Sequence, residues 1–168
     1  VQPWKWLYTE RNLFLIHDPV IGKSFGDYNY LGSYISYGAA LENLIQEAQN
    51  LDLSVGIEYP DTNSGKLEVV ACIKFYKNDL GNQSIVKENL SSQIKKRLTN
   101  RKRTECSPLE LDVKSTLINT AKSIPGAELK LFTDREVVKQ VGRLIGIADK
   151  LRFFNEGGHH DFFVKEAR

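Results

Sequence analysis

Short apolar runs predict four strands in the first half of the chain. Aromatic residues alternate with other residues over positions 4–9, which is the pattern of a strand with one buried face. A polar turn separates this run from the apolar residues 13–16, so the two runs predict a β-hairpin. Residues 53–59 and 67–76 predict two more strands, and the second of these is apolar on both faces, which is typical of a central strand.

Helical periodicity begins after the first hairpin. Apolar residues recur every three or four positions from Ile35 to Ala48 and predict an amphipathic helix that ends near Leu51. The rest of the chain predicts helices at 83–97, 107–122 and 133–154, a strand at 129–132 and a short helix within 155–168. Thr133 and Glu136 have the spacing of a capping box at the start of the third helix. Hairpins mixed with helices, without regular alternation, predict an α+β fold whose sheet is mixed or mostly antiparallel and flanked by helices.

The composition is that of one ordinary globular domain. The chain has 168 residues, of which 41% are hydrophobic and 26% charged, and a net charge of +2. This net charge is too small to indicate nucleic-acid binding, so a preference for anions must come from a local cluster. No apolar run is long enough to span a membrane. Cys72 and Cys106 lie far apart, which indicates reduced thiols in a cytoplasmic protein.

The strongest candidate for a binding site is a basic segment. Six of the nine residues in the range 95–103 are Lys or Arg. Arg97, Thr99 and Arg101 alternate, so an extended backbone would project all three to one side. Two guanidinium groups with a hydroxyl between them suit a phosphate dianion. One alternative is a solvated helix end whose cations complement the helix dipole. Another is a nucleic-acid contact, which is disfavoured because no aromatic residue lies among the cations to stack on a base.

Other candidate chemistry is weaker. His159 and His160 adjoin two glycines and Asp161, but adjacent histidines point apart and no third ligand follows at a typical spacing, so we predict no metal site. His17, beside Asp18 at a strand end, is expected to be a structural hydrogen-bonding residue. No nucleophile elbow, P-loop or dinucleotide-binding glycine motif occurs. We therefore expect no catalytic side chain.

Three segments together resemble the flavin-binding nitroreductase family. The alternating residues at 97–101 stand where that family has an Arg-x-Ser-x-Arg/Lys segment that holds the phosphate of FMN. Gln2, Pro3 and Trp4 match the end of an Asn-x-Gln-Pro-Trp segment that lines the flavin. The helical residues 38–48 look like the long core helix of the family. The resemblance implies that all six motif residues contact the cofactor, with Trp4 either a wall at the edge of the flavin or a core residue.

The order of these segments departs from that of ordinary nitroreductases. Here the basic segment follows Gln-Pro-Trp by about ninety residues, whereas in those enzymes it comes first. The order is similar to the tandem Acg-type branch and to nitroreductase-like domains fused to ThiF-type adenylyltransferases. In those proteins two related units build one molecule. The resemblance thus implies a first unit at about 1–93 and the start of a second at about 94–168. The chain lacks methionine even at position 1, which also suggests part of a longer protein.

The resemblance implies an FMN-dependent oxidoreductase that uses NAD(P)H to reduce an electron-poor small molecule such as a quinone or nitroaromatic compound. Because the flavin of this family lies between two units, we expect a homodimer or further parts of a longer polypeptide to complete the site. One alternative is a non-catalytic flavin-binding or regulatory module associated with a ThiF-like partner. A second is a protein that binds anions or nucleic acid through the basic segment.

Overall fold

The computed structural model describes residues 2–60, 69–77, 90–99, 102 and 107–166. The chain forms two compact units. Unit 1 consists of residues 1–98 and 152–168, and unit 2 of residues 99–151. The predicted phosphate-binding residue Arg101 and the second cysteine, Cys106, lie outside the described residues.

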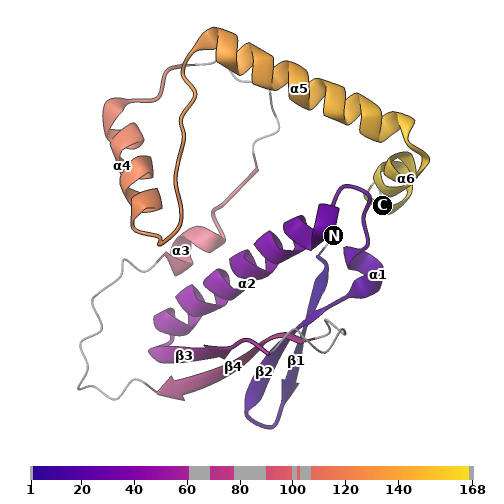
Figure 1. The fold of residues 1–168 in the computed structure, drawn as a ribbon. Helices are drawn as coiled ribbons and strands as arrows, with labels where there is room; N and C mark the ends of the chain where they lie inside the picture. Colours follow the sequence, from indigo (N-terminus) through magenta and orange to yellow (C-terminus); the bar gives the residue numbers. More distant parts are fainter. Residues whose placement is uncertain (1, 61–68, 78–89, 100–101, 103–106, 167–168) are drawn as a thin grey trace. The chain divides into compact units, whose positions relative to one another are not determined.

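Unit 1 is built on a four-stranded antiparallel sheet (Figure 1). Its strands are β1 (Trp4–Thr9), β2 (Asn12–His17), β3 (Leu53–Glu58) and β4 (Val69–Lys77). They lie in the order β1-β2-β4-β3, and each neighbouring pair is antiparallel. This arrangement confirms the α+β class, the predicted first hairpin and the central position of β4.

The longest helix of unit 1, α2, also follows the prediction. It runs from Leu31 to Asn50, one residue short of the predicted end. The shorter helical elements of unit 1 are α1 (Pro19–Gly22), the 3-10 turn η1 (Tyr28–Tyr30), α3 (Ser91–Ile94), α6 (Glu156–His160) and the π-helical turn η3 (Asp161–Glu166). The helix predicted at 83–97 is not confirmed. Part of it lies outside the described residues, and the described part is helical only in α3.

The core of unit 1 lies between α2 and one face of the sheet (Figure 1). Leu15 pairs with Ala71 across β2 and β4, and both side chains are fully buried together with that of Ile73. Tyr37 and Leu41 of α2 complete the buried cluster. Half-buried apolar side chains extend it: Trp4, Leu13, Leu44, Val55, Ile57 and Val70. The two hairpins, which are distant in sequence, are therefore held together by the β2–β4 pairing and by one helix.

Unit 2 contains helix α4 (Leu111–Lys122) and most of helix α5 (Arg135–Phe154). The strand predicted at 129–132 is absent, because these residues have no regular secondary structure. A strand is stable only when a neighbour satisfies its backbone N–H and C=O groups, and the apolar pattern of four residues does not supply that neighbour. None of the described residues of unit 2 is buried.

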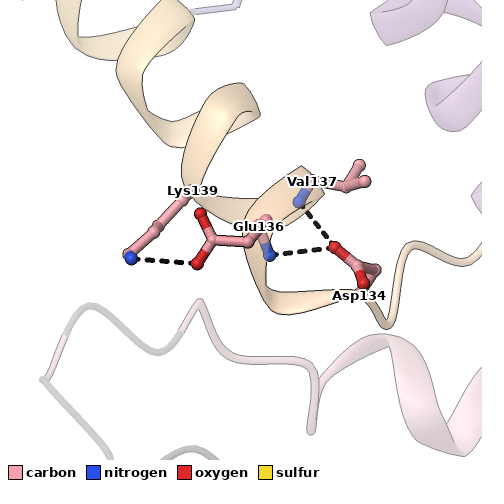
Figure 2. A network of polar contacts seen from close by, with 4 residues as sticks. All are labelled: Asp134, Glu136, Val137 and Lys139. Atoms are coloured by element: carbon pink, nitrogen blue, oxygen red, sulfur yellow. Dashed lines mark hydrogen bonds and ion pairs between the residues drawn. The ribbon is translucent and has the colours of Figure 1, made fainter.

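The start of α5 shows a cap that differs by one residue from the prediction. Asp134, not Thr133, caps the helix (Figure 2). Its Oδ1 accepts hydrogen bonds of 2.9 Å from the amides of Glu136 and Val137. The Glu136 carboxylate instead pairs with Lys139 at 3.0 Å, so it does not return to the cap as a capping box requires. A carboxylate satisfies two free amides at once and also favours the positive end of the helix dipole.

Because Leu15 lies in the core, Leu15→Ala is expected to lower the stability of the fold strongly. Leu15 is fully buried, so the truncation leaves a cavity and should lower the free energy of unfolding by about 3 kcal/mol. Leu98→Ala is the matched control, because this side chain is 88% exposed and the same change should cost less than about 0.5 kcal/mol. Chemical denaturation followed by circular dichroism measures both. Equal effects of the two variants would contradict the assigned core.

Candidate functional site

The N-terminal motif lies where β1 begins beside the end of β2. Gln2 is exposed, whereas Pro3 and Trp4 are half-buried. The amide of Asp18 donates a hydrogen bond of 2.9 Å to the carbonyl of Pro3. Trp4 stands opposite His17 in the β1–β2 register, so the two side chains share the face of the sheet that α2 covers. The motif is therefore fixed to the sheet at the end nearest the start of α2.

The ring of Trp4 packs against the core cluster and lies edge-to-face against Trp6, with 5.5 Å between the ring centroids. Trp4 is therefore a core residue whose side chain is partly exposed. The exposed part allows contact with a ligand, which is the other role that the resemblance implies for this residue.

The basic segment follows α3, and α3 is anchored on α2. The Ser91 hydroxyl donates a hydrogen bond to the Glu47 carboxylate, and the amide of Leu90 donates one of 3.3 Å to Oε1 of Gln46. A turn then ends α3, in which the amide of Arg97 donates to the carbonyl of Gln93 at 3.0 Å. The start of the basic segment is therefore held against the C-terminal half of α2.

Two of the three predicted phosphate ligands are described, and both Arg97 and Thr99 are exposed. Lys95, Lys96 and Lys102 are exposed as well, so each cation of the segment that the structure describes lies at the surface. Because Arg101 is not described, the joint geometry of the three residues stays a prediction.

A polar group lies at the start of α2, and we call it the His17 cluster: His17, Ser33 and Tyr37, which are buried, and Asp27, which is half-buried. The Tyr37 hydroxyl and Nδ1 of His17 share a hydrogen bond inside the structure. The Ser33 hydroxyl donates to Oδ2 of Asp27 at 2.6 Å. The Asp27 carboxylate also accepts hydrogen bonds from the amides of Gly32 at 2.6 Å and Ser33 at 3.0 Å. These bonds join the end of β2 to the first turn of α2.

Burial and hydrogen bonding set the charge states in and near this cluster. Burial raises the pKa of the Tyr37 hydroxyl, which therefore stays protonated at neutral pH. Burial also raises the pKa of Asp27, but hydrogen bonds from the Ser33 hydroxyl and from the amides of Gly32 and Ser33 outweigh it, so the pKa is lowered overall. The hydrogen bond from Lys5, 2.6 Å away, lowers the pKa of the Asp18 carboxyl.

Backbone strain is concentrated beside the cluster. Asn29 and Tyr30 have φ values of 51° and 59°, in the left-handed region that favours glycine. This conformation costs about 1–2 kcal/mol in Tyr30, whereas asparagine adopts it more readily. The conformation places the Tyr30 ring edge-to-face against His17, with 5.4 Å between the centroids. Strain of this kind persists only where surrounding contacts impose it.

The sequence predicted only part of the His17 cluster. The prediction that His17 is a structural hydrogen-bonding residue is confirmed by its bond to Tyr37. The roles of Asp27, Ser33 and Tyr37 were missed. Asp27 carried a usable signal, because an Asp shortly before an amphipathic helix is typical of an N-terminal cap.

The C-terminal segment is fastened to the loop before η1. Asp161, which is buried, accepts a hydrogen bond of 2.5 Å from the amide of Phe25. A Cβ at position 157 would lie 3.4 Å from the Phe25 ring, which is an ordinary van der Waals contact, so α6 lies directly beside this loop. His159 is exposed and its ring contacts that of Phe163 in a tilted arrangement, with 4.5 Å between the centroids. In the described part of the chain, no three His, Cys, Asp or Glu side chains form a group that could hold a metal ion.

Comparison with protein-family models, with curated proteins and with solved structures finds no match to this chain. Among the helices described, none combines the length and the apolar character needed to cross a membrane.

The lowered pKa of Asp27 predicts a specific acid sensitivity. A carboxyl whose folded pKa lies below its ordinary value of 3.8 stabilises the fold at neutral pH, and this stability is lost as the pH falls through the folded pKa. Asp27→Asn keeps a capping oxygen but removes the titration. We expect its free energy of unfolding to depend less on pH than that of the wild type below about pH 4. Urea denaturation across this range measures the difference.

The control for this experiment is Asp52→Asn, an exposed carboxylate whose left-handed backbone also suits asparagine. It should retain the wild-type pH dependence. Identical curves for Asp27→Asn and the wild type would show that Asp27 does not carry the assigned charge.

The hydrogen bond between Asp161 and Phe25 predicts that the Phe25 amide is protected from hydrogen exchange. A charged hydrogen bond contributes about 1.5–3 kcal/mol, so Asp161→Ala should speed hydrogen exchange at the Phe25 amide about tenfold or more. Glu156→Ala, which removes an exposed carboxylate from the same segment, should leave that amide unchanged. Amide-resolved exchange by NMR distinguishes the two, and an unaltered Phe25 rate in Asp161→Ala would refute the contact.

Proposed function

We propose that this chain binds FMN along α2, with the basic segment holding the phosphate and the Gln2–Trp4 end of β1 contacting the flavin ring. The observation that carries the proposal is the attachment of these two segments to one helix. The N-terminal motif is joined to α2 through His17, which bonds Tyr37. The basic segment is joined to it through Ser91, which bonds Glu47.

The spacing of these attachments suits an FMN molecule. Tyr37 and Glu47 are ten positions apart in α2, which corresponds to about 15 Å along a helix. In FMN a ribityl chain separates the ring from the phosphate, so the two ends of the cofactor need contacts at two separate places on the protein. Two segments anchored at a distance from one another along a rigid helix meet this requirement.

The chemistry of the candidate residues also fits the cofactor. Arg97 is exposed on the basic segment, and guanidinium groups bind phosphate through paired charged hydrogen bonds. Thr99 supplies a hydroxyl, and Gln2 an exposed amide that can bond the polar edge of a ring. The half-buried indole of Trp4 offers an apolar wall. These residues bind and orient, and none is assigned a proton-transfer or nucleophilic role.

When bound, FMN would accept hydride from NAD(P)H and pass electrons to an electron-poor small molecule. The contribution of the protein would then be orientation and electrostatics. A module that binds FMN without turnover, as a regulator of a ThiF-like partner, would use the same contacts. We also expect a second copy or further parts of a longer polypeptide to supply the other side of the flavin.

The first test is the visible absorption spectrum of the purified protein, with mass spectrometry of any molecule released by denaturation. FMN titration then tests the phosphate contact. Arg97→Ala combined with Arg101→Ala should weaken FMN binding by about 3 kcal/mol or more, which is over a hundredfold in the dissociation constant, because it removes at least two charged hydrogen bonds.

The matched control is Arg135→Ala combined with Arg143→Ala, which removes two exposed arginines from α5 and changes the net charge equally. It should leave FMN affinity unchanged. Oxidation of NAD(P)H by the loaded protein would favour the enzyme over the binding module. Equal FMN affinity of the two double variants would contradict the phosphate contact of Arg97 and Arg101. Binding of oligonucleotides that weakens with salt, in a protein that holds no flavin, would favour the anion-binding alternative.

A further inference from the structure

Strand β1 leaves one of its two edges open. It lies at a margin of the sheet, and among the strands that the structure describes only β2 pairs with it (Figure 1). The β1–β2 register runs from Trp4 to Thr9 without a bulge. Along the open edge, every second residue directs its backbone N–H and C=O groups away from the sheet. These groups can form hydrogen bonds with an added strand.

The features that normally protect an edge strand are missing from β1. Such strands usually carry a proline, a bulge or a free charge. Residues 4–9 contain no proline, and their only charged residue is Lys5. The Lys5 ammonium lies 2.6 Å from the Asp18 carboxylate, so its charge is neutralised within the same chain. The strand at the other margin, β3, is less suited to pairing, because it has Gly56 in its interior and no aromatic residue.

Large side chains along this edge are only partly covered. Trp6 is 36% exposed, Leu7 47% and Tyr8 67%. By alternation, the rings of Trp6 and Tyr8 lie on the same face as Trp4, which packs on the core cluster. They lie beside the buried core and do not belong to it. A strand added to β1 would remove part of their apolar surface from water, which is favourable.

We propose that β1 of a second copy of this chain pairs antiparallel with β1, so that the two four-stranded sheets form one continuous sheet. The pairing is centred on Trp6, which stands opposite Trp6 of the second copy. Trp4 then stands opposite Tyr8 of the second copy, and Lys5 stands opposite Leu7 of the second copy. A two-fold axis through the central pair relates the copies, so each of the other pairs occurs twice.

The sequence of β1 is complementary to itself in this register. Opposite residues of an antiparallel pair lie on the same face of the sheet, so Trp4, Trp6 and Tyr8 meet only aromatic partners, and such pairs stabilise a sheet. A shift of two residues in one direction would place Lys5 opposite Lys5 of the second copy, which is unfavourable. A shift in the other direction would place Trp4 opposite the turn residue Glu10, beyond the end of the strand.

The interface is small, so we expect a weak dimer. A fully covered aromatic side chain buries about 150–250 Å², so the exposed fractions of Trp6 and Tyr8 correspond to roughly 200 Å² in each copy. With the rest of the strand, the total stays below about 1,200 Å², which is the range of weak and transient complexes. We therefore expect the dimer at micromolar to millimolar concentrations. The pairing of β1 does not depend on FMN, so it stands or falls separately from the proposed function.

Sedimentation equilibrium of the 168-residue chain over this concentration range tests the dimer. Two variants of Leu7 test the register, because this residue faces Lys5 of the second copy in both outer pairs. Leu7→Lys places like charges opposite each other, whereas Leu7→Glu places opposite charges there. Leu7→Glu should therefore dimerise about tenfold more tightly than Leu7→Lys.

Ser54→Lys and Ser54→Glu are the matched controls, because they make the same changes of charge at an exposed position of β3. Both should dimerise as the wild type does. A wild-type chain that stays monomeric up to millimolar concentration would overturn the proposal. Equal dimerisation of folded Leu7→Lys and Leu7→Glu would overturn it as well.

Tyr8→Ala is the second test if Leu7→Lys does not fold, as judged by circular dichroism. It removes the ring opposite Trp4 from both outer pairs and should weaken dimerisation about tenfold. Tyr59→Ala is its control, because Tyr59 is 69% exposed, as Tyr8 nearly is, but lies outside β1. Equal dimerisation of these two variants would overturn the pairing of β1.

Discussion

The packing of α2 on the sheet is the interaction on which unit 1 depends. The fully buried side chains of Leu15, Ala71 and Ile73 come from two strands that are more than fifty residues apart, and Tyr37 and Leu41 of α2 cover them. Loss of this contact would expose the apolar face of the sheet and separate the two hairpins. The end of β2 beside the N-terminal motif and the start of α3 are both held in place by hydrogen bonds to side chains of this helix, through Tyr37 and Glu47 respectively.

Tyr37 links this core to the polar cluster. Its ring contributes apolar area to the core, but its hydroxyl is buried with it and a buried hydroxyl without a partner costs free energy. The structure meets this requirement with His17, whose Nδ1 shares a hydrogen bond with the Tyr37 hydroxyl. The tyrosine at this core position of α2 therefore requires a polar partner at the end of β2, and that partner is the histidine opposite Trp4.

Local sequence patterns predicted the strands and the long helix of unit 1, whereas the features that were missed or wrongly predicted depend on tertiary contacts. The alternation in β1 and the periodicity of α2 are properties of short segments, so the sequence alone indicated both. The predicted strand at 129–132 failed because a strand needs a partner that its own pattern does not specify. The His17 cluster joins residues up to twenty positions apart, and no pattern within one segment shows that His17 meets Tyr37. The predicted phosphate-binding residue Arg101 lies outside the described residues.

The left-handed backbone of Tyr30 has a consequence for how this sequence can vary. Glycine would relieve the strain at this position but would remove the ring that contacts His17. A residue that is unfavourable for its backbone is tolerated there because the ring contact compensates. Selection for stability alone would replace it, whereas selection for a fixed His17 would retain an aromatic residue. Among natural variants of this chain, the identity of residue 30 would therefore report which of these two constraints has been stronger.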